Sequence, residues 1–426
     1  MQLFLYSKGC SNMKGITVFN CALFVGMSIA SLQTLSAQTI YGMRQGILPW
    51  EQGLYLGGYD IMSNTWVYGD TLEYAEGFGL GTSTFNQWDE AYVFLGLPSG
   101  GTGLEWMSHS VEAEGAETTA EVFGNMHSIH HDMQNGKFYG LEGYGLDSTW
   151  MDWGTRVITL EVEDGQVNTI PILEMDWMQG VVAGSSCYDS DLHHFYIWGI
   201  DNTGVGRLVT VDCEAGSIVA DVSPEMGSNA NLSEFEFNIN DGQLIGLKAT
   251  YTANGDADME LIVVDPLSGV ITPQLALPQV DFYTPDGTEF DQLNGFYILH
   301  YYQDQGIGLN SSIMAIDAAT WEVVVDVPLD ANFVELEMSN ASFATLRYSP
   351  ANVSDESLSR IDLEKGYWIN NSPGSFAVRR FDITGRLAVP ATTIPPNARL
   401  EVPSGNWLWD FQGINGLRFS RHTIRS

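Results

Sequence analysis

The sequence is poor in basic residues. Its 426 residues include 17 Lys and Arg against 53 Asp and Glu, which gives a formal net charge of −36. Binding to a nucleic-acid backbone needs clustered Lys and Arg, so this composition excludes a nucleic-acid ligand for the body of the chain. Cations, sugars and proteins remain as ligand classes, and the simplest interpretation of the charge is that it keeps a secreted protein soluble.

Cysteine is scarce as well, with four in the whole chain. Only Cys187 and Cys213 lie beyond the N-terminal region. One pair in a chain of this length is not a disulfide scaffold. Two interpretations stay open: the two thiols pair in an oxidising compartment, or both are buried and free.

Long apolar runs are missing beyond the N-terminal region, so no later segment is expected to cross a bilayer. Residues 1–37 have the layout of a secretory signal peptide, with Lys8 and Lys14 before an apolar stretch and Ala37 at the expected cut. An uncleaved anchor is the alternative, although the apolar stretch is shorter than ~20 residues and contains Asn20. We therefore expect a protein that is secreted or lies on the outer cell surface after cleavage near Ala37.

Catalytic motifs are also missing, so no catalytic or cofactor-binding residue is predicted. The stretch "DLHHFYIW" brings Asp191, His193 and His194 together, but no Ser in a nucleophile-elbow context accompanies it. The stretch "MHSIHHDMQNG" holds residue types that ligate zinc. On a strand, however, His130 and His131 point to opposite faces, so this cluster is not expected to converge on a metal.

The sequence does contain a repeat. An apolar alternation ends in an acidic residue, a tight turn follows, and another β-rich run comes after it. The acidic residues are Asp60, Glu161, Asp212, Asp265, Asp317 and Asp362, with a degenerate copy near Val111. From Glu161 onward the copies are 45 to 53 residues apart.

A second landmark precedes most of these turns. An Asp or Asn stands five or six residues before an aromatic or apolar strand start, at Asn86, Asp132, Asp189, Asn238 and Asp291. Side chains of Asp and Asn hydrogen-bond nearby backbone amides in such turns. "EMSNASFATLRY" keeps the expected strand but places Met338 at the turn position.

Each repeat unit is predicted to be four short strands. Such a sheet has two faces to bury, and radial stacking of copies buries them, which is the principle of a β-propeller. The fold class is therefore all-β, with a propeller of six or seven four-stranded blades over residues 38–373. "VELEMSN" could supply the inner strand that the first copy lacks, which would close six blades. The parallel between "LRYSPANVSDESLSRIDLEKG" and "LKATYTANGDADMELIVVDPLSG" slightly favours seven.

The last residues, 374–426, differ from the body in composition, with seven Arg against three acidic residues. "AVRRFDITGRLA" and "SGNWLWDFQGINGLRFSRHTIRS" resemble the type A C-terminal sorting domain of Bacteroidetes proteins exported by the type IX secretion system. The residues that match are Asp382, Thr384, Gly385, Arg386, Gly405 and Gly416. The resemblance implies a small β-sandwich-like domain read by the secretion and sorting machinery. "YSPAN" at Tyr348 is the only stand-in for that family's opening motif, and a domain start near residue 348 is the alternative boundary.

One metal site is predicted. "NGDADME" places four oxygen-donor side chains at alternate positions of a loop, and such donors suit calcium. They are Asn254, Asp256, Asp258 and Glu260. The alternative is a charged hairpin without a metal.

These features predict an exported propeller that binds an extracellular glycan or protein. The rival class is a secreted hydrolase or lyase with its site at the mouth of the propeller channel. Convergence of carboxylates and histidines from the inner strands on one point would favour the rival. The ligand, the blade number and the oligomeric state are not determined by the sequence.

Overall fold

A computed structural model describes most of the chain beyond residue 38. The described ranges are 39–45, 54–111, 117–122, 124–146, 152–163, 165–253, 257–304, 309–329, 333–348, 361–364, 367–370, 376–381, 387–394, 399–401, 405–413 and 418–425. These residues are almost all in strands, with one short helix. None of the described helical structure is long and apolar enough to cross a membrane.

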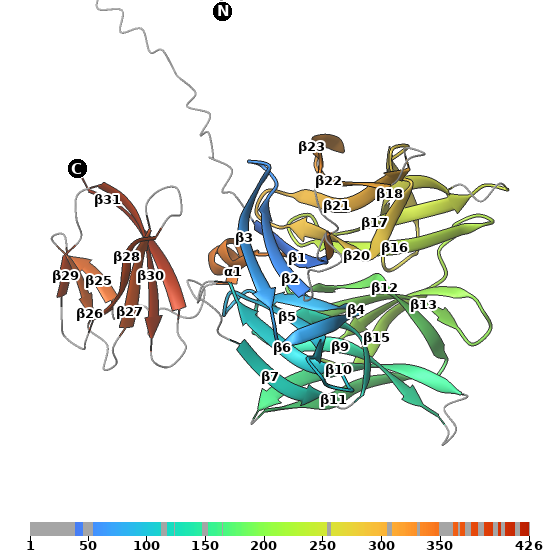
Figure 1. The fold of residues 1–426 in the computed structure, drawn as a ribbon, viewed down its shortest axis with the longest axis horizontal. Helices are drawn as coiled ribbons and strands as arrows, with labels where there is room; N and C mark the ends of the chain where they lie inside the picture. The colour runs from blue at the N-terminus through green and yellow to red at the C-terminus, as the bar shows by residue number, and fades with distance from the viewer. Residues whose placement is uncertain are drawn as a thin grey trace, which may run out of the picture. The chain divides into compact units, whose positions relative to one another are not determined.

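The main body is a β-propeller, and its described residues form six blades of four strands (Figure 1). Blades 2 and 3 join along their outer strands into one eight-stranded sheet. Blade 1 contains β24 (Phe333–Met338), β1 (Thr39–Gln45), β2 (Leu54–Asp60) and β3 (Thr65–Leu72). Blade 2 contains β4 (Ala75–Asn86), β5 (Ala91–Pro98), β6 (Glu105–Ser110) and β7 (Glu117–Val122). Blade 3 contains β8 (Asn125–His131), β9 (Phe138–Gly145), β10 (Trp153–Glu163) and β11 (Gln166–Met175).

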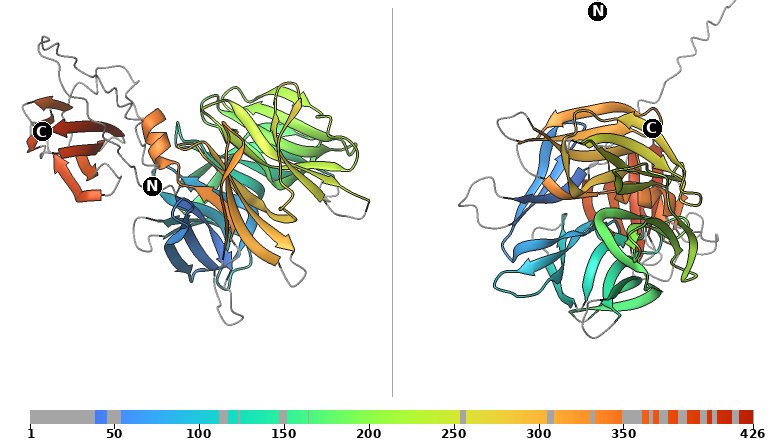
Figure 2. Two further views of the ribbon diagram at one scale, coloured as in Figure 1. Left: turned by 90° about the horizontal axis from the view of Figure 1, so that it is seen from above. Right: turned by 90° about the vertical axis from the view of Figure 1, so that its right-hand side faces the viewer.

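The other three blades follow the same plan. Blade 4 contains β12 (Met178–Asp189), β13 (His194–Asp201), β14 (Gly206–Asp212) and β15 (Ser217–Val222). Blade 5 contains β16 (Ala230–Asn238), β17 (Gln243–Tyr251), β18 (Ala257–Val264) and β19 (Ile271–Ala276). Blade 6 contains β20 (Phe282–Asp291), β21 (Phe296–Asp304), β22 (Leu309–Asp317) and β23 (Glu322–Pro328). The blades succeed one another around a common centre (Figure 2).

Asx turns join the strands where the sequence predicts them. The Oδ1 atom of Asp189 accepts hydrogen bonds from the amides of Asp191 and Leu192, and Oδ1 of Asp265 accepts from the next two turn amides in the same way. The pattern recurs at Asn86, Asp132, Asn238, Asp291, Asp60, Asp212 and Asp317. The Asp or Asn landmark is therefore confirmed as a turn at all five predicted positions, and the acidic landmark at Asp60, Asp212, Asp265 and Asp317.

The propeller has six blades, so the slight preference for seven in the sequence analysis is wrong. β24, which contains "FVELEM", is the innermost strand of blade 1 and pairs antiparallel with β1. The seventh copy of the acidic turn, at Asp362, lies on β25 (Ile361–Glu364), which pairs with β26 (Tyr367–Asn370) and not with a propeller strand. Six blades close because the chain returns an inner strand to the first, incomplete copy.

The segment after β24 is helical and not a strand. Helix α1 (Ala341–Tyr348) replaces the strand expected in "ASFATLRY". Asn340 precedes the helix; its Oδ1 accepts from the amide of Gln292 and its Nδ2 donates to the carbonyl of Phe290. Asn340 thus hydrogen-bonds to the backbone of the neighbouring blade 6. The chain then leaves the propeller through α1 and does not start a seventh sheet.

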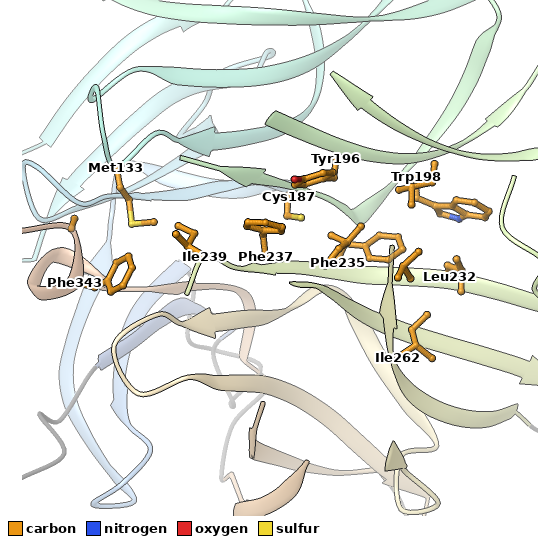
Figure 3. Packing of buried hydrophobic residues seen from close by; sticks show 14 residues of the cluster. Met133, Cys187, Tyr196, Trp198, Leu232, Phe235, Phe237, Ile239, Ile262 and Phe343 are labelled. Atoms are coloured by element: carbon orange, nitrogen blue, oxygen red, sulfur yellow. The ribbon is translucent and has the colours of Figure 1, made fainter. Parts of the chain in front are cut away.

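The core lies between the faces of adjacent blades. Between blades 4 and 5, the rings of Tyr196 and Phe237 stack with centroids 5.0 Å apart. The same cluster includes Cys187 and, from α1, Phe343 (Figure 3). Cys187 and Cys213 are both buried free thiols, so the second of the two interpretations is the one the structure adopts.

The C-terminal segment forms two sheets in its described residues. β26 pairs with β29 (Arg399–Glu401), and the second sheet has the order β28-β27-β30-β31. Its strands are β27 (Phe376–Phe381), β28 (Leu387–Ile394), β30 (Gly405–Gly413) and β31 (Arg418–Arg425). Gly405 begins β30. The other predicted sorting residues, Asp382, Thr384, Gly385, Arg386 and Gly416, lie outside the described residues.

Closure by β24 is expected to depend on Phe333. Its side chain is fully buried and meets Trp66 edge to face at 5.2 Å, in space left by Gly42 and Gly57. Phe333→Ala should lower the free energy of unfolding by about 3–5 kcal/mol because it leaves a cavity at the closing strand. Val323→Ala, on the outer strand β23, should change it by less than about 0.5 kcal/mol. Chemical denaturation measures both, and an equal effect of the two would contradict a closing role for Phe333.

Candidate functional site

The inner strands carry a bulge at the same level in each blade. Five of these bulges contain a residue with left-handed φ, at Gly81, Gly184, Glu234, Asp286 and Glu335. In β8 the bulge falls at His127. Residues other than glycine are uncommon in this backbone conformation. Its recurrence shows that the bulge is part of the architecture and not a local irregularity.

A ring of polar side chains follows the bulges, with one member from each inner strand. This channel ring consists of Ser83, Ser128, Ser186, Glu236, Thr288 and Glu337, all of which line one central cavity. Its members hydrogen-bond across blade boundaries: Ser83 Oγ donates to Glu337 Oε1 at 2.8 Å, and Thr288 Oγ1 donates to Glu236 at 2.9 Å. The third pair is Ser128 and Ser186, 2.8 Å apart.

Two acidic bulge residues bind the backbone of the next blade. Glu335 accepts from the amide of Gly81 at 2.9 and 3.0 Å and from that of Thr82 at 3.3 Å. Glu234 Oε2 accepts from the amide of Gly287 at 3.1 Å. These carboxylates satisfy amides that the bulges free from the sheet, so they have a structural role between blades 1 and 2 and between blades 5 and 6.

The channel is acidic and lacks a cationic partner. Glu236, Asp286, Glu289 and Glu337 line the cavity, and neither Lys nor Arg is among its described lining residues. Burial raises the pKa of Asp286 to about 7, and burial together with the charge of Asp286 raises that of Glu289 to about 7. Burial lowers the pKa of His130 to about 4. At neutral pH the histidine is thus uncharged, and the carboxyl groups retain protons.

The size of the channel cavity limits what it can hold. Its volume is about 80 Å³. A buried water needs roughly 10–15 Å³ in this measure, whereas pockets for organic ligands measure roughly 300–1,000 Å³. The channel therefore has room for several waters and is too narrow for a sugar ring.

A larger pocket lies between blades 5 and 6. Its volume is about 500 Å³, within the range of ligand sites. Three aromatic side chains line it: Tyr251 and Phe282, which are 46% and 54% exposed, and Tyr283, whose hydroxyl is 2.7 Å from Ser233 Oγ. We call this the mouth pocket.

Glu234 lines the mouth pocket and is also the bulge residue of the inner strand β16. Its side chain is 1% exposed and lines the pocket. Oε2 is held by the Gly287 amide, whereas Oε1 has no hydrogen-bond partner among the described residues. Burial, followed by the charge of Asp286, raises the pKa of Glu234 well above its usual range. Oε1 has almost no accessible surface and lies beside Gly184 of blade 4, so the carboxyl group is enclosed by the fold.

A third hollow, between blades 4 and 5, offers fewer free polar groups. Leu192, Leu267 and Val270 line it and are exposed. Its carboxylates are already engaged, since Asp189 accepts from turn amides and Asp191 pairs with Arg347. Its volume is about 790 Å³, and its lining also includes His194 and Gln243, whose Oε1 has no hydrogen-bond partner among the described residues.

The predicted calcium residues do not form a site in the described part of the chain. Asn254 and Asp256 lie outside the described residues. Asp258 and Glu260 lie on β18, where Glu260 Oε2 is 3.8 Å from Lys248 Nζ. No group of three His, Cys, Asp or Glu among the described residues is placed to hold a metal ion. Calcium at this hairpin therefore stays a prediction.

Most polar side chains of the two histidine-rich motifs make hydrogen bonds or ion pairs that stabilise turns and helix α1. His193 Nδ1 is 2.7 Å from Asp132 Oδ2, and Asp132 Oδ1 accepts from turn amides. Asp191 binds Arg347 and Tyr348 of α1. The side chains of "DLHHFYIW" thus form no triad. His130 is the exception within "MHSIHHDMQNG", because its Nε2 lies 3.0 Å from Ser128 Oγ in the channel.

The channel ring and the mouth pocket are absent from the sequence predictions. A signal for the ring exists: Ser83, Ser186 and Thr288 each stand three residues before the Asx-turn residue, and Glu236 stands two before. A polar residue two to four positions before the turn residue, within an otherwise apolar inner strand, indicates a common environment. No comparable signal exists for the mouth pocket, whose lining comes from strands of two blades.

The chain resembles several solved propeller-sized structures at low similarity. No protein-family model matches it, and no curated protein matches its sequence. A structure of the nidogen/laminin complex aligns with TM-score 0.44 and 12% identity, covering 71% of this chain and 98% of that one. A putative 6-phosphogluconolactonase from Bacteroides fragilis aligns with TM-score 0.42 and 9% identity, covering 72% and 99%.

A periplasmic gluconolactonase from Pseudomonas aeruginosa aligns with TM-score 0.42 and 12% identity, covering 70% of this chain and 99% of that one. With identities this low and TM-scores below 0.5, none of these similarities transfers an activity. The function must be argued from the residues of this chain.

The acidic channel predicts a pH dependence of stability. A carboxyl group whose pKa is raised on folding binds protons that the unfolded chain releases, so stability falls as pH rises through the folded value. Lowered histidine pKa values act in the opposite direction only below about pH 6.5. The melting temperature should therefore fall between about pH 6.5 and 8, and Glu289→Gln should flatten that slope.

The matched control is Glu322→Gln, an exposed position on β23, which should keep the wild-type slope. Thermal unfolding followed by circular dichroism across this pH range measures all three proteins. An unchanged slope in Glu289→Gln would show that the channel carboxyl group does not take up protons on folding.

Proposed function

We propose that this protein is an exported β-propeller that binds an extracellular glycan in the mouth pocket. The observation that carries the proposal is the combination of exposed Tyr251 and Phe282 with polar groups around a cavity of about 500 Å³. Aromatic faces stack on the apolar faces of sugar rings, and a few polar groups fix the orientation of the ligand.

A second candidate function is hydrolysis in the channel. Carboxyl groups and His130 converge there from several inner strands, which is the arrangement expected of the rival class. Carboxyl groups whose pKa values are raised toward neutrality, such as Asp286 and Glu289, suit acid–base chemistry. The cavity of about 80 Å³ opposes this function for a sugar-sized substrate, so binding at the mouth pocket is the better-supported proposal.

Export through a type IX system is the second part of the proposal. It rests on the resemblance of the basic C-terminal segment to a sorting domain, and on the signal-like N-terminus. The separation of charge supports it: the acidic body contains the pockets, and the arginine-rich end follows as a segment of its own. On this proposal the protein acts outside the cell, secreted or retained at the surface.

Phe282→Ala tests the mouth pocket. The side chain is 54% exposed, so its removal should leave the melting temperature nearly unchanged. Loss of a stacking surface should weaken glycan binding about two- to tenfold. Binding of the full chain to a glycan array identifies the ligand, and titration of the best glycan compares wild type, Phe282→Ala and the control Val323→Ala. Equal affinity in all three would exclude the mouth pocket as the site.

A reporter fusion tests export. Residues 349–426 fused behind a signal peptide and a neutral fluorescent protein should reach the surface or medium of a bacterium that carries a type IX system. The same fusion without residues 405–426 should stay in the periplasm, because the last two matched elements are missing. Retention of the complete fusion in the periplasm would refute the sorting role.

A further inference from the structure

Helix α1 lies at the end of the channel where the inner strands finish. Five of these strands end in an Asx turn, so β16 runs from its bulge at Glu234 to its turn at Asn238. Asn340, directly before α1, lines the channel cavity with Met133 and Gln292 from the turns of blades 3 and 6. We call this side the turn end of the channel. The mouth pocket, which Glu234 lines, lies toward the opposite end, where the bulges are.

Phe343 makes the apolar contact between α1 and the turns. Its side chain is 6% exposed, and it belongs to the same cluster as Met133 of blade 3 and Ile239 of blade 5 (Figure 3). Leu293 of blade 6 packs against this cluster as well. These turns come from three blades around the channel. A helix that packs on all of them therefore covers the space between them.

Two polar side chains at the end of α1 attach it to blades 4 and 5. Arg347 Nε donates to Asp191 Oδ1 at 3.0 Å, its Nη2 pairs with the same carboxylate, and its Nη1 donates to Asn240 Oδ1 at 3.3 Å. The hydroxyl of Tyr348 donates to Asp191 Oδ1 at 2.8 Å. Both members of the ion pair are 32% exposed, and exposed pairs contribute little to stability. Such a contact can open locally without unfolding of the blades.

We infer that α1 is a latched plug that closes the turn end of the channel, with Phe343 as the plug and Asp191 as the acceptor that holds Arg347 and Tyr348. With α1 in place, the titratable groups of the channel are shielded from solvent at this end. Hydrolysis in the channel, the second candidate function, would need α1 to move before a substrate could enter from this side. The inference depends neither on glycan binding at the mouth pocket nor on the export route.

Oxidation of the native methionines tests the inference in the full chain. Peroxide converts an accessible methionine to its sulfoxide, and tandem mass spectrometry of the digested chain follows each residue. Met133, under α1, is 8% exposed; Met126, at the start of the same inner strand, is 6% exposed; Met62 is 40% exposed. Initial rates for Met133 and Met126 should be at least about tenfold lower than that for Met62, because both require local opening.

Three variants open the plug. Asp191→Asn and Arg347→Ala remove the ion pair and should raise the oxidation rate of Met133 about two- to fivefold, as expected for an exposed pair. The double variant should react at about the rate of the faster single variant, because the two residues form one contact. Phe343→Ala removes the plug itself and should raise the rate at least about tenfold. The rate for Met126 should stay unchanged in all of them.

Arg207→Ala is the matched control. Arg207 also pairs with an aspartate, Asp221, at 28% and 29% exposure, and its guanidinium lies 5.7 Å from the ring centroid of Trp177. The corresponding distance from Arg347 to the ring of Phe343 is 5.6 Å. Arg207 lies on β14, outside the contacts that hold α1. Its loss should therefore leave the oxidation rate of Met133 at the wild-type value.

The other possible outcomes overturn the inference. Oxidation of Met133 as fast as that of Met62 in the wild-type chain would show that α1 leaves the turn end open. Equal rates for Met133 in the wild type and in all the plug variants would show that these contacts hold nothing closed. A parallel rise for Met133 and Met126 would mean that α1 only stabilises the propeller as a whole. Additive effects in the double variant would remove Asp191 as the acceptor that holds Arg347.

Discussion

Pairing of β24 with β1 is the interaction on which the rest of the structure depends. It gives blade 1 its inner strand and joins the last part of the propeller sequence to the first. The closing strand also carries Glu335, which accepts from the amides of Gly81 and Thr82 in blade 2, and Glu337, which accepts from Ser83. Closure therefore fixes both the number of blades and the polar interior of the ring.

The acidic interior follows from the bulges of the inner strands. A bulge frees backbone amides close to the channel, and carboxylates on neighbouring strands satisfy them, as Glu234 does for Gly287. The same arrangement gathers more carboxyl groups than the amides can neutralise. No Lys or Arg belongs to the described cavity lining, and burial raises the pKa of Asp286 and, together with the charge of Asp286, that of Glu289, so these groups retain protons.

The channel cavity and the mouth pocket differ in size and in lining, and therefore suit different functions. The channel has many titratable groups and little space, whereas the mouth pocket has space, exposed rings and one buried carboxylate oxygen without a partner. Glu234 belongs to both environments, because it lines the mouth pocket and its Oε2 accepts from the Gly287 amide of blade 6.

The sequence by itself determined the all-β class, the Asx turns and the blade repeat, because these depend on local hydrogen bonds and on alternation within one strand pair. It did not determine the number of blades, because Phe333–Met338 pairs with a strand almost three hundred residues earlier. It also did not predict α1, because the sequence of that segment has the pattern expected of a strand. Only the tertiary structure forms the candidate site. The mouth pocket is lined by Glu234 and Phe282 from two different blades, and no local sequence pattern around either residue predicts that the two lie close together.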